Sequence, residues 1–184
     1  MLSLSDAERT HILALARHAV VDAVCHNRQL AEIPGLEVFE QRLGVFVTLH
    51  VGGKLRGCIG VVEAKEKLGE SIVRCSAGAA MEDPRFQPME ARELAHLSIE
   101  VSLLSRLVRV EPEAVEVGKH GLLIQQGIRR GLLLPQVAVE HRLGREEFLR
   151  ETCHKAGLPP DAWKAPDTQI FAFTCEILEE SPAA

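Results

Sequence analysis

A thiol flanked by glycines is the first feature of this chain that could do chemistry. Residues 55–60 read Leu-Arg-Gly-Cys-Ile-Gly, so Cys58 lies between Gly57 and Gly60 and two residues from the fixed positive charge of Arg56. Glycine inside a strand marks a bulge or a place where another group approaches the backbone closely. A nearby guanidinium favours the thiolate. We therefore consider Cys58 a candidate nucleophile, and Arg56, Gly57 and Gly60 candidate ligand contacts.

The alternative is that Cys58 is a small apolar core residue, as free cysteines often are. Residues 45–51 alternate in polarity as a strand does, with Val47 on the apolar side, and Gly52-Gly53 is a two-residue turn into a partner strand over 54–62. Strict pairing across that turn places Cys58 opposite Val47, toward the core. A bulge at Gly57 would turn the thiol to the other face, and the sequence alone leaves both arrangements open.

A second candidate loop reads Glu-Asp-Pro-Arg-Phe over residues 82–86. Its Glu82, Asp83 and Arg85 side chains can supply an acid, a base or an anion clamp, because a loop held on a scaffold positions such groups. The competing interpretation is structural. A helix then ends in solvated charges before Pro84, and Arg85 pairs with a neighbouring carboxylate for little net stability.

A third candidate lies in the glycine-rich segment 118–121, which reads Gly-Lys-His-Gly. By residue type, His120 is the best general acid or base, and Lys119 can hold phosphate or carboxylate as a point charge. The alternative is a solvated turn. Gln136 follows an apolar run and Pro135, where it either faces a cleft or caps a helix.

Several common activities are excluded by spacing. We find no Walker loop, G-x-G-x-x-G fingerprint, H-E-x-x-H pair, G-x-S-x-G elbow or C-x-x-C pair. The neighbouring residues Cys25-His26 and Cys153-His154 point about 100° apart on a helix and cannot readily chelate one ion. We therefore expect neither a metal nor a cofactor.

The composition argues against nucleic acid and membrane partners. Lys and Arg number 21 against 26 Asp and Glu, the net charge is −5, and one Trp, six Phe and no Tyr leave little stacking surface. No apolar run approaches the roughly 20 residues of a membrane span. The N-terminus lacks the basic start of a secretory signal, and five cysteines without paired spacing suit a reducing interior. We expect a cytoplasmic protein.

The elements that would position these residues mix helices and strands without a regular βαβ alternation, which indicates an α+β fold. We expect a mixed, mainly antiparallel sheet with flanking helices, in a single domain over 1–184 with its core at about 6–178. A capping box at Ser5 and Glu8 begins the first helix. Helices are also expected over 66–83, from Pro135 and over 146–156, and strands over 45–51, 54–62, 97–103, weakly 108–117, as a hairpin within 118–134, and 170–178.

Five segments together resemble the AMMECR domain family, specifically the AmmeMemoRadiSam system protein A of bacteria and archaea. They occur in order at residues 55–60, 82–86, 118–122, 131–137 and 155–159, and the similarity extends over roughly 6–177. The resemblance implies two lobes around a cleft, with the segment of Cys58 near that cleft. It also implies a Memo-like protein and a radical SAM protein as partners, but no known reaction.

Two functions follow as hypotheses. The first is an accessory or ligand-binding component of that system, with a cleft around Cys58. Radical chemistry would then reside in the partner, because this chain lacks a C-x-x-x-C-x-x-C motif. The alternative is an enzyme with Cys58 as nucleophile and His120 as acid or base, in which Arg56, Arg85 and Lys119 hold an anionic small molecule, or a nucleic-acid-modification factor. A homodimer is left open.

Overall fold

The chain divides into two compact units. The computed structural model describes residues 4–26 and 32–180. Unit 1 comprises Met1–Leu104 and Glu176–Ala184, and unit 2 comprises Ser105–Cys175. Each unit has its own four-stranded sheet and its own cluster of buried apolar side chains. Helices and antiparallel strand pairs together confirm the α+β class. The single domain and the cleft stay predictions.

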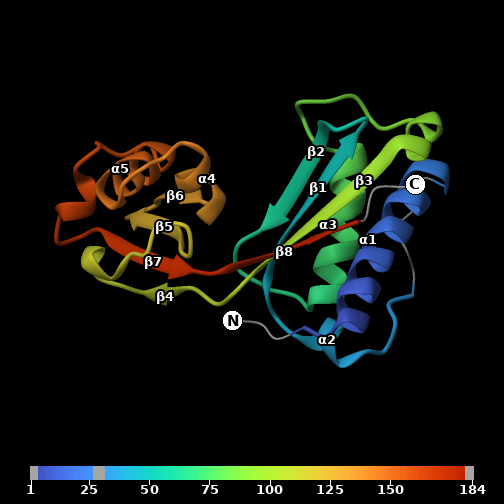
Figure 1. Cartoon of the computed structure of the whole chain (residues 1–184), viewed down its shortest axis with the longest axis horizontal. Coiled ribbons are helices and arrows are strands. Elements are labelled where there is room, and N and C mark those ends of the chain that lie inside the picture. The colour runs from blue at the N-terminus through green and yellow to red at the C-terminus, as the bar shows by residue number, and fades with distance from the viewer. Residues whose placement is uncertain (1–3, 27–31, 181–184) are drawn as a thin grey trace. The chain divides into compact units, whose positions relative to one another are not determined.

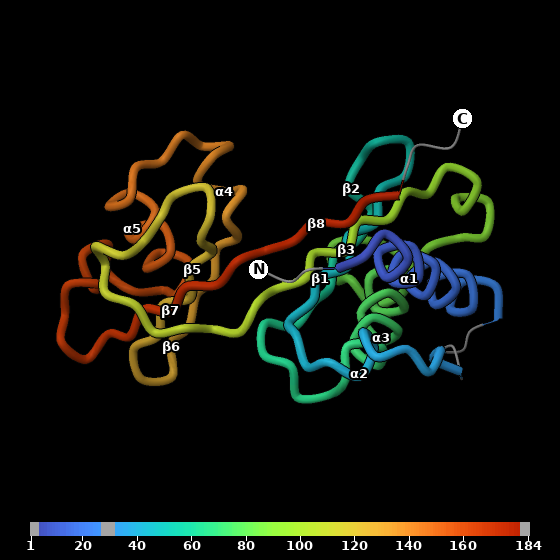
Figure 2. The backbone as a smooth tube through the Cα atoms, turned by 60° about the horizontal axis from the view of Figure 1, so that its bottom comes forward, coloured from blue at the N-terminus to red at the C-terminus, as the bar shows by residue number. Residues whose placement is uncertain are grey.

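Unit 1 is a sheet with two long helices against one face. The strands are β1 (Gly44–Val51), β2 (Lys54–Val61), β3 (Leu97–Leu104) and β8 (Cys175–Glu179), in the order β2-β1-β3-β8. Helices α1 (Asp6–His26) and α3 (Leu68–Met81) lie side by side on this sheet (Figures 1 and 2). The short α2 (Glu37–Glu40) precedes β1, and a 3₁₀ helix, η1 (Ala91–His96), precedes β3.

The two long helices form as the sequence predicts. The Glu8 carboxylate accepts the backbone N–H of Ser5 at 2.8 Å, and Ser5 Oγ accepts the N–H of Glu8 at 3.3 Å, so the capping box is confirmed. One face of each helix is buried against the sheet. In α1 this face includes Ile12, Ala16, Ala19, Val20 and Ala23, and in α3 it includes Leu68, Ile72, Cys75 and Ala79.

The hairpin of β1 and β2 contains a bulge that strict pairing did not predict. The Gly52-Gly53 turn has positive φ angles of 58° and 75°, as expected. Leu49, however, pairs with Gly57 and His50 with Leu55, which leaves Arg56 as the extra residue. Cys58 therefore lies opposite Thr48, and the core-facing arrangement opposite Val47 is wrong.

The bulge has a packing reason. Strict pairing would have turned Arg56 toward the helices and Ile59 and Val61 away from them. With one extra residue, Ile59 lies opposite Val47 and Val61 opposite Val45, and both pack against the core of unit 1. Burying two aliphatic side chains and releasing a guanidinium favours the shifted register.

Unit 2 contains β4 (Val108–Arg109), β5 (Gly121–Gln126), β6 (Arg129–Leu133) and β7 (Gln169–Phe173) in the order β4-β7-β5-β6. Its helices are α4 (Pro135–Glu140) and α5 (Arg145–Lys155), with 3₁₀ helices η2 (Pro112–Ala114) and η3 (Ala162–Lys164). The predicted β5–β6 hairpin, Pro135 at the start of a helix and Gly157 as a cap with φ 69° are confirmed.

The last predicted strand is in fact two strands in two sheets. It breaks at Thr174, whose N–H and carbonyl bond to Ser105 Oγ and Ser105 N, each at 2.9 Å, instead of to a ladder. Consequently β7 belongs to the sheet of unit 2 and β8 to that of unit 1. The weak strand over 108–117 is also shorter than expected, because Pro112 begins a 3₁₀ turn. Within the described residues, no helix is both long and apolar enough to cross a membrane.

Candidate functional site around Cys58

Cys58 lies on the face of the unit 1 sheet that α1 and α3 leave uncovered. Val47 and Leu49 of β1 are fully buried against the helices, so the alternating Thr48 points to the other face, and its partner Cys58 points with it. The thiol is half-buried, and the Thr48 hydroxyl hydrogen-bonds Sγ at 3.4 Å. Glu100 of β3 lies opposite Thr48 on its other side.

The two glycines flanking Cys58 are places of close approach. A Cβ on Gly57 would be 2.0 Å from the carbonyl oxygen of Ala79, so α3 rests directly on the β2 backbone. A Cβ on Gly60 would be 2.3 Å from the ring of Phe46, which covers that position from β1. The glycines thus serve the packing around Cys58, and their role as ligand contacts stays a prediction.

Asp83 ties the second candidate loop to Cys58. Its carboxylate is buried and accepts the backbone N–H of Cys58 at 2.8 Å. Because β2 is an edge strand, this bond satisfies an outward N–H that no strand reaches. The same carboxylate accepts Arg85 Nε at 3.0 Å and Nη2 at 2.7 Å. Hydrogen bonding to Arg85, and then to the N–H groups of Cys58 and Arg85, holds the pKa of Asp83 well below its usual range.

Arg56, the bulged residue, is bound within unit 1. Its Nε donates to Glu93 at 2.7 Å and its Nη2 donates to the Gln87 carbonyl at 2.9 Å. Its Nη1 is buried without a hydrogen-bond partner among the described residues. The guanidinium groups of Arg56 and Arg85 lie 5.8 and 5.4 Å from the centroid of the Phe86 ring. Glu82, the remaining candidate of this loop, is exposed.

Three of the other cysteines differ from Cys58 in accessibility, whereas Cys175 in β8 is half-buried like Cys58. Cys75 is fully buried in α3, and burial raises the pKa of its thiol to about 11. Burial also raises the pKa of Cys153 in α5. Cys25, near the end of α1, is exposed. Cys75 and Cys153 are therefore poor nucleophiles in the folded protein.

The third group of candidates lies in unit 2. Lys119 Nζ pairs with the Glu116 carboxylate at 2.9 and 3.0 Å, and the backbone N–H of Glu116 donates to His120 Nδ1 at 3.1 Å. This bond orients the imidazole of His120. Gly118, with φ 83°, places the loop against Val139 of α4. Gln136, in the same helix, has a buried Oε1 without a hydrogen-bond partner in the described part of the chain.

The candidates thus form two groups. One group, in unit 1, comprises Arg56, Gly57, Cys58, Gly60, Glu82, Asp83 and Arg85, of which Glu82 makes none of the contacts described above. The other group, in unit 2, comprises Lys119, His120 and Gln136. Each is held by contacts within its own unit, and a convergence of the two groups stays a prediction. Among residues 4–26 and 32–180, no three His, Cys, Asp or Glu side chains are grouped as metal ligands.

Sequence reasoning missed the roles of three residues in this unit 1 group. The role of Thr48 follows only from the bulged register, which the apolar alternation of Ile59 and Val61 could have indicated. Glu93 binds Arg56 from a 3₁₀ helix 37 residues away, and no sequence signal marks this pairing. Phe86 was quoted as part of a motif without a role, and its ring lies near the guanidinium groups of Arg56 and Arg85.

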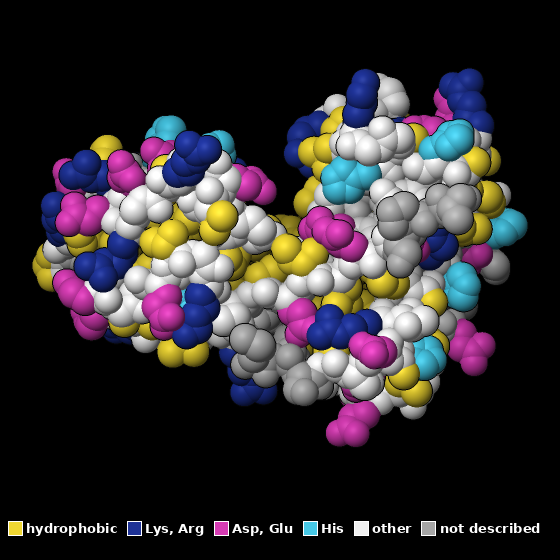
Figure 3. Space-filling view, viewed as in Figure 1, with side chains coloured by type: hydrophobic (Ala, Val, Ile, Leu, Met, Phe, Trp, Pro, Cys, Tyr) yellow, Lys and Arg dark blue, Asp and Glu magenta, His cyan; other side chains and the backbone are white. Residues whose placement is uncertain are grey.

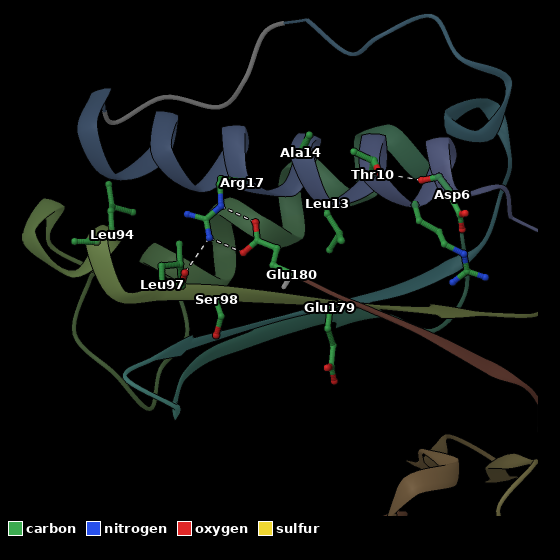
Figure 4. A pocket seen from close by; sticks show the side chains of 12 residues that line it. Asp6, Thr10, Leu13, Ala14, Arg17, Leu94, Leu97, Ser98, Glu179 and Glu180 are labelled. Atoms are coloured by element: carbon green, nitrogen blue, oxygen red, sulfur yellow. Dashed lines mark hydrogen bonds and ion pairs between the residues drawn. The ribbon is translucent and has the colours of Figure 1, made fainter. Parts of the chain in front are cut away.

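A separate groove of about 760 Å³ lies between α1 and the start of β3 (Figure 4). Arg17 Nε donates to Glu180 at 2.6 Å, and Arg17 Nη2 donates to the Leu97 carbonyl at 2.9 Å. Glu180 also accepts the Ile99 N–H at 3.0 Å. These contacts hold Glu180, which directly follows β8, against α1 and β3, so this cluster has a structural role.

Known proteins resemble this chain over almost its whole length. Protein TK0174 of Thermococcus kodakarensis is 44% identical over 193 residues, covering 98% of this chain and 94% of that protein. Protein MK0488 of Methanopyrus kandleri is 40% identical, covering 97% and 90%. The crystal structure of the uncharacterized protein PH0010 from Pyrococcus horikoshii has a TM-score of 0.89 and 37% identity, covering 97% and 94%. The model of the family described as AMMECR1 matches residues 13–178, and this chain therefore belongs to the AMMECR1 family.

Proposed function

We propose that this protein is an accessory, ligand-binding component of the AmmeMemoRadiSam system, and that it works with a Memo-like protein and a radical SAM protein. The ligand is a small anion that contacts Cys58 and Arg85 on the uncovered face of the unit 1 sheet. In this role Cys58 is a contact residue and not an activated nucleophile.

One observation favours a ligand-binding component over an enzyme. The thiol of Cys58 has the Thr48 hydroxyl as its hydrogen-bond neighbour, and among the described residues no imidazole or carboxylate side chain hydrogen-bonds Sγ. The charges nearby are already paired, Arg56 with Glu93 and Asp83 with Arg85. A thiol nucleophile needs a base or an unpaired positive charge beside it. In the described part of unit 1, no such group hydrogen-bonds Sγ, and Arg85, the exposed guanidinium nearby, is paired with Asp83.

Arg85 supports the class of ligand. Its side chain is 53% exposed although Asp83 binds its Nε and Nη2, so the remaining edge of the guanidinium faces solvent beside the Cys58 strand. A guanidinium oriented by a buried carboxylate is preorganised to bind carboxylate or phosphate. Arg56 is too enclosed for this role and instead supports the loop through Glu93 and Phe86.

Co-expression with the Memo-like and radical SAM proteins of the same genome tests the partnership. We expect the tagged chain to retain both partners through purification, and Cys58→Ala to retain them equally, because a contact thiol is not needed for docking. Failure of the wild-type chain to retain either partner at low and moderate salt would overturn the accessory role.

Alkylation of the native protein tests the role of the thiol. In a Cys25→Ser background, with peptide mass spectrometry separating Cys58 from the equally half-buried Cys175, we expect iodoacetamide to modify Cys58 at pH 7 no faster than it modifies free N-acetylcysteine. Cys75 and Cys153 should be modified only after unfolding. A rate for Cys58 at least about tenfold above that of the free thiol would support the enzyme instead.

A further inference from the structure

We infer that unit 2 carries a separate binding site for a small amphipathic anion, in a cavity between α4 and α5. The cavity has a volume of about 590 Å³, which is in the range of small-molecule sites. It is lined by Leu133, Val137, His141, Leu143, Glu151, His154 and Lys155. None of these residues belongs to the proposed Cys58 site.

The floor of the cavity is apolar because of the way α4 ends. The Leu143 N–H bonds to the Ala138 carbonyl at 2.8 Å and the Arg142 N–H to the Val139 carbonyl at 3.1 Å, which is a Schellman motif. Arg142 takes the left-handed position with φ 54°, which costs free energy in any residue but glycine. The motif turns Leu143 back toward α4, where it shares the cavity with Val137 and with Leu133 at the end of β6.

These three aliphatic side chains are only partly buried. Leu133 and Leu143 pack with one side against the buried cluster of unit 2, and their other side lines the cavity. An apolar ligand body placed there would remove this surface from water. A chain of several methylene groups gains affinity in proportion to the apolar area it buries.

The polar rim of the cavity consists of a lysine, a glutamate and two histidines. Glu151, His154 and Lys155 are three and four residues apart and lie on one face of α5, and His141 faces them from the end of α4. His154 Nδ1 lies 3.8 Å from the Glu151 carboxylate. Lys155 has no hydrogen-bond or ion-pair partner among the described residues, so its ammonium group is available to an anion.

Three of the last carbonyl oxygens of α5 are not free to repel an anion. The carbonyls of Thr152, Cys153 and His154 accept the N–H groups of Ala156, Leu158 and Gly157, at 3.1, 2.9 and 2.9 Å. The last oxygens of the helix are therefore largely satisfied. A carboxylate or phosphate beside the ammonium group of Lys155, with an aliphatic body over Leu143, would use both the unpaired lysine and the apolar surface of the cavity.

Octanoate and octyl phosphate are suitable probes, and octyltrimethylammonium is the charge-reversed control. Binding to the full chain is measured by isothermal titration calorimetry and by backbone amide NMR. We expect saturable binding of both anions that shifts the amide signals of Leu133, Val137 and Leu143. We expect Lys155→Glu to weaken this binding about fivefold or more. Arg106→Glu, an exposed change of equal charge in the same unit, should leave it unchanged.

Octanoate tests a carboxylate source and octyl phosphate a phosphate source, and binding of either supports the site. Equal binding of the cation, equal weakening by Arg106→Glu, or no saturable binding of any probe would overturn it. If Lys155→Glu fails to fold, Leu143→Asn gives the same test through the apolar floor, with circular dichroism to confirm its helices. A failure at this site leaves the Cys58 proposal unaffected, because the variants lie in different units.

Discussion

The carboxylate of Asp83 joins Cys58 to its surroundings, and its removal should be costly. Asp83→Asn keeps the shape but loses the charge that binds Arg85 and the Cys58 N–H. We expect the variant to lose about 2 kcal/mol of unfolding free energy at pH 7. Urea denaturation followed by circular dichroism measures this difference.

The difference should also depend on pH. The pKa of Asp83 is lowered in the folded protein, so its ionised form stabilises the fold fully above the ordinary pKa of about 4. That contribution is lost as the pH falls below 4 toward the folded pKa, and the gap between wild type and Asp83→Asn should narrow there. Glu82→Gln changes an exposed neighbouring carboxylate and is the control. It should change the unfolding free energy little at either pH. A gap that stays constant down to pH 3 would contradict the ionic origin.

Gly57 tests the close approach of α3 to β2. Gly57→Ala would place a methyl group about 2 Å from the Ala79 carbonyl, so the helix or the strand must shift. We expect a loss of about 3 kcal/mol or more in unfolding free energy, since overpacking against backbone is hard to relieve. Gly35→Ala, where no atom lies within 4 Å, should change it by less than about 0.5 kcal/mol. If Gly57→Ala is as stable as the wild type, the close contact between α3 and the backbone at Gly57 is refuted.

At the scale of elements, the sequence predicted most helices and strands because their cues are local. The capping box at Ser5, the Gly52-Gly53 turn and the cap at Gly157 each depend on a few adjacent residues. The sequence left the choice between strict pairing and a bulge near Gly57 open, because the bulge, found at Arg56, depends on which side of β2 packs against α3. The sequence did not predict the break at Thr174, because its cause is a hydrogen bond to Ser105, which is 69 residues away.

The end of α4 offers a gain in stability. Arg142 has φ 54°, a conformation that glycine adopts without strain. Arg142→Gly relieves that strain but makes the unfolded chain more flexible, so we expect a net gain of about 0.5–1 kcal/mol in unfolding free energy. Urea denaturation measures this gain as a higher midpoint, while the dependence of the unfolding free energy on urea concentration stays the same. A lower midpoint would show that the Arg142 side chain contributes more than the strain costs.

At the scale of the whole molecule, composition was informative about charge and not about the site. Basic and acidic side chains intermingle over both units on the face seen in Figure 3, in line with the net charge of −5. The candidate site instead depends on pairs distant in sequence, such as Cys58 with Asp83 and Arg56 with Glu93. Residue types could nominate these side chains, but only the fold shows that the two arginines are already paired.

The two units should respond separately to damage in their cores. Leu178 of β8 and Ile170 of β7 are each 4% exposed, the first in the core of unit 1 and the second in that of unit 2. Truncating either to alanine should remove about 3 kcal/mol of stability. Native-state hydrogen exchange shows where that loss falls.

We expect Leu178→Ala to speed exchange in β1 and β3 while β5 and β7 keep their protection, and Ile170→Ala to do the reverse. Leu178 is the sharper probe, because β8 returns from the far end of the chain to complete the sheet of unit 1. If instead each substitution speeds exchange equally in all four strands, the chain unfolds as one cooperative domain. That result would favour the single domain inferred from its length, since two cores would then open together.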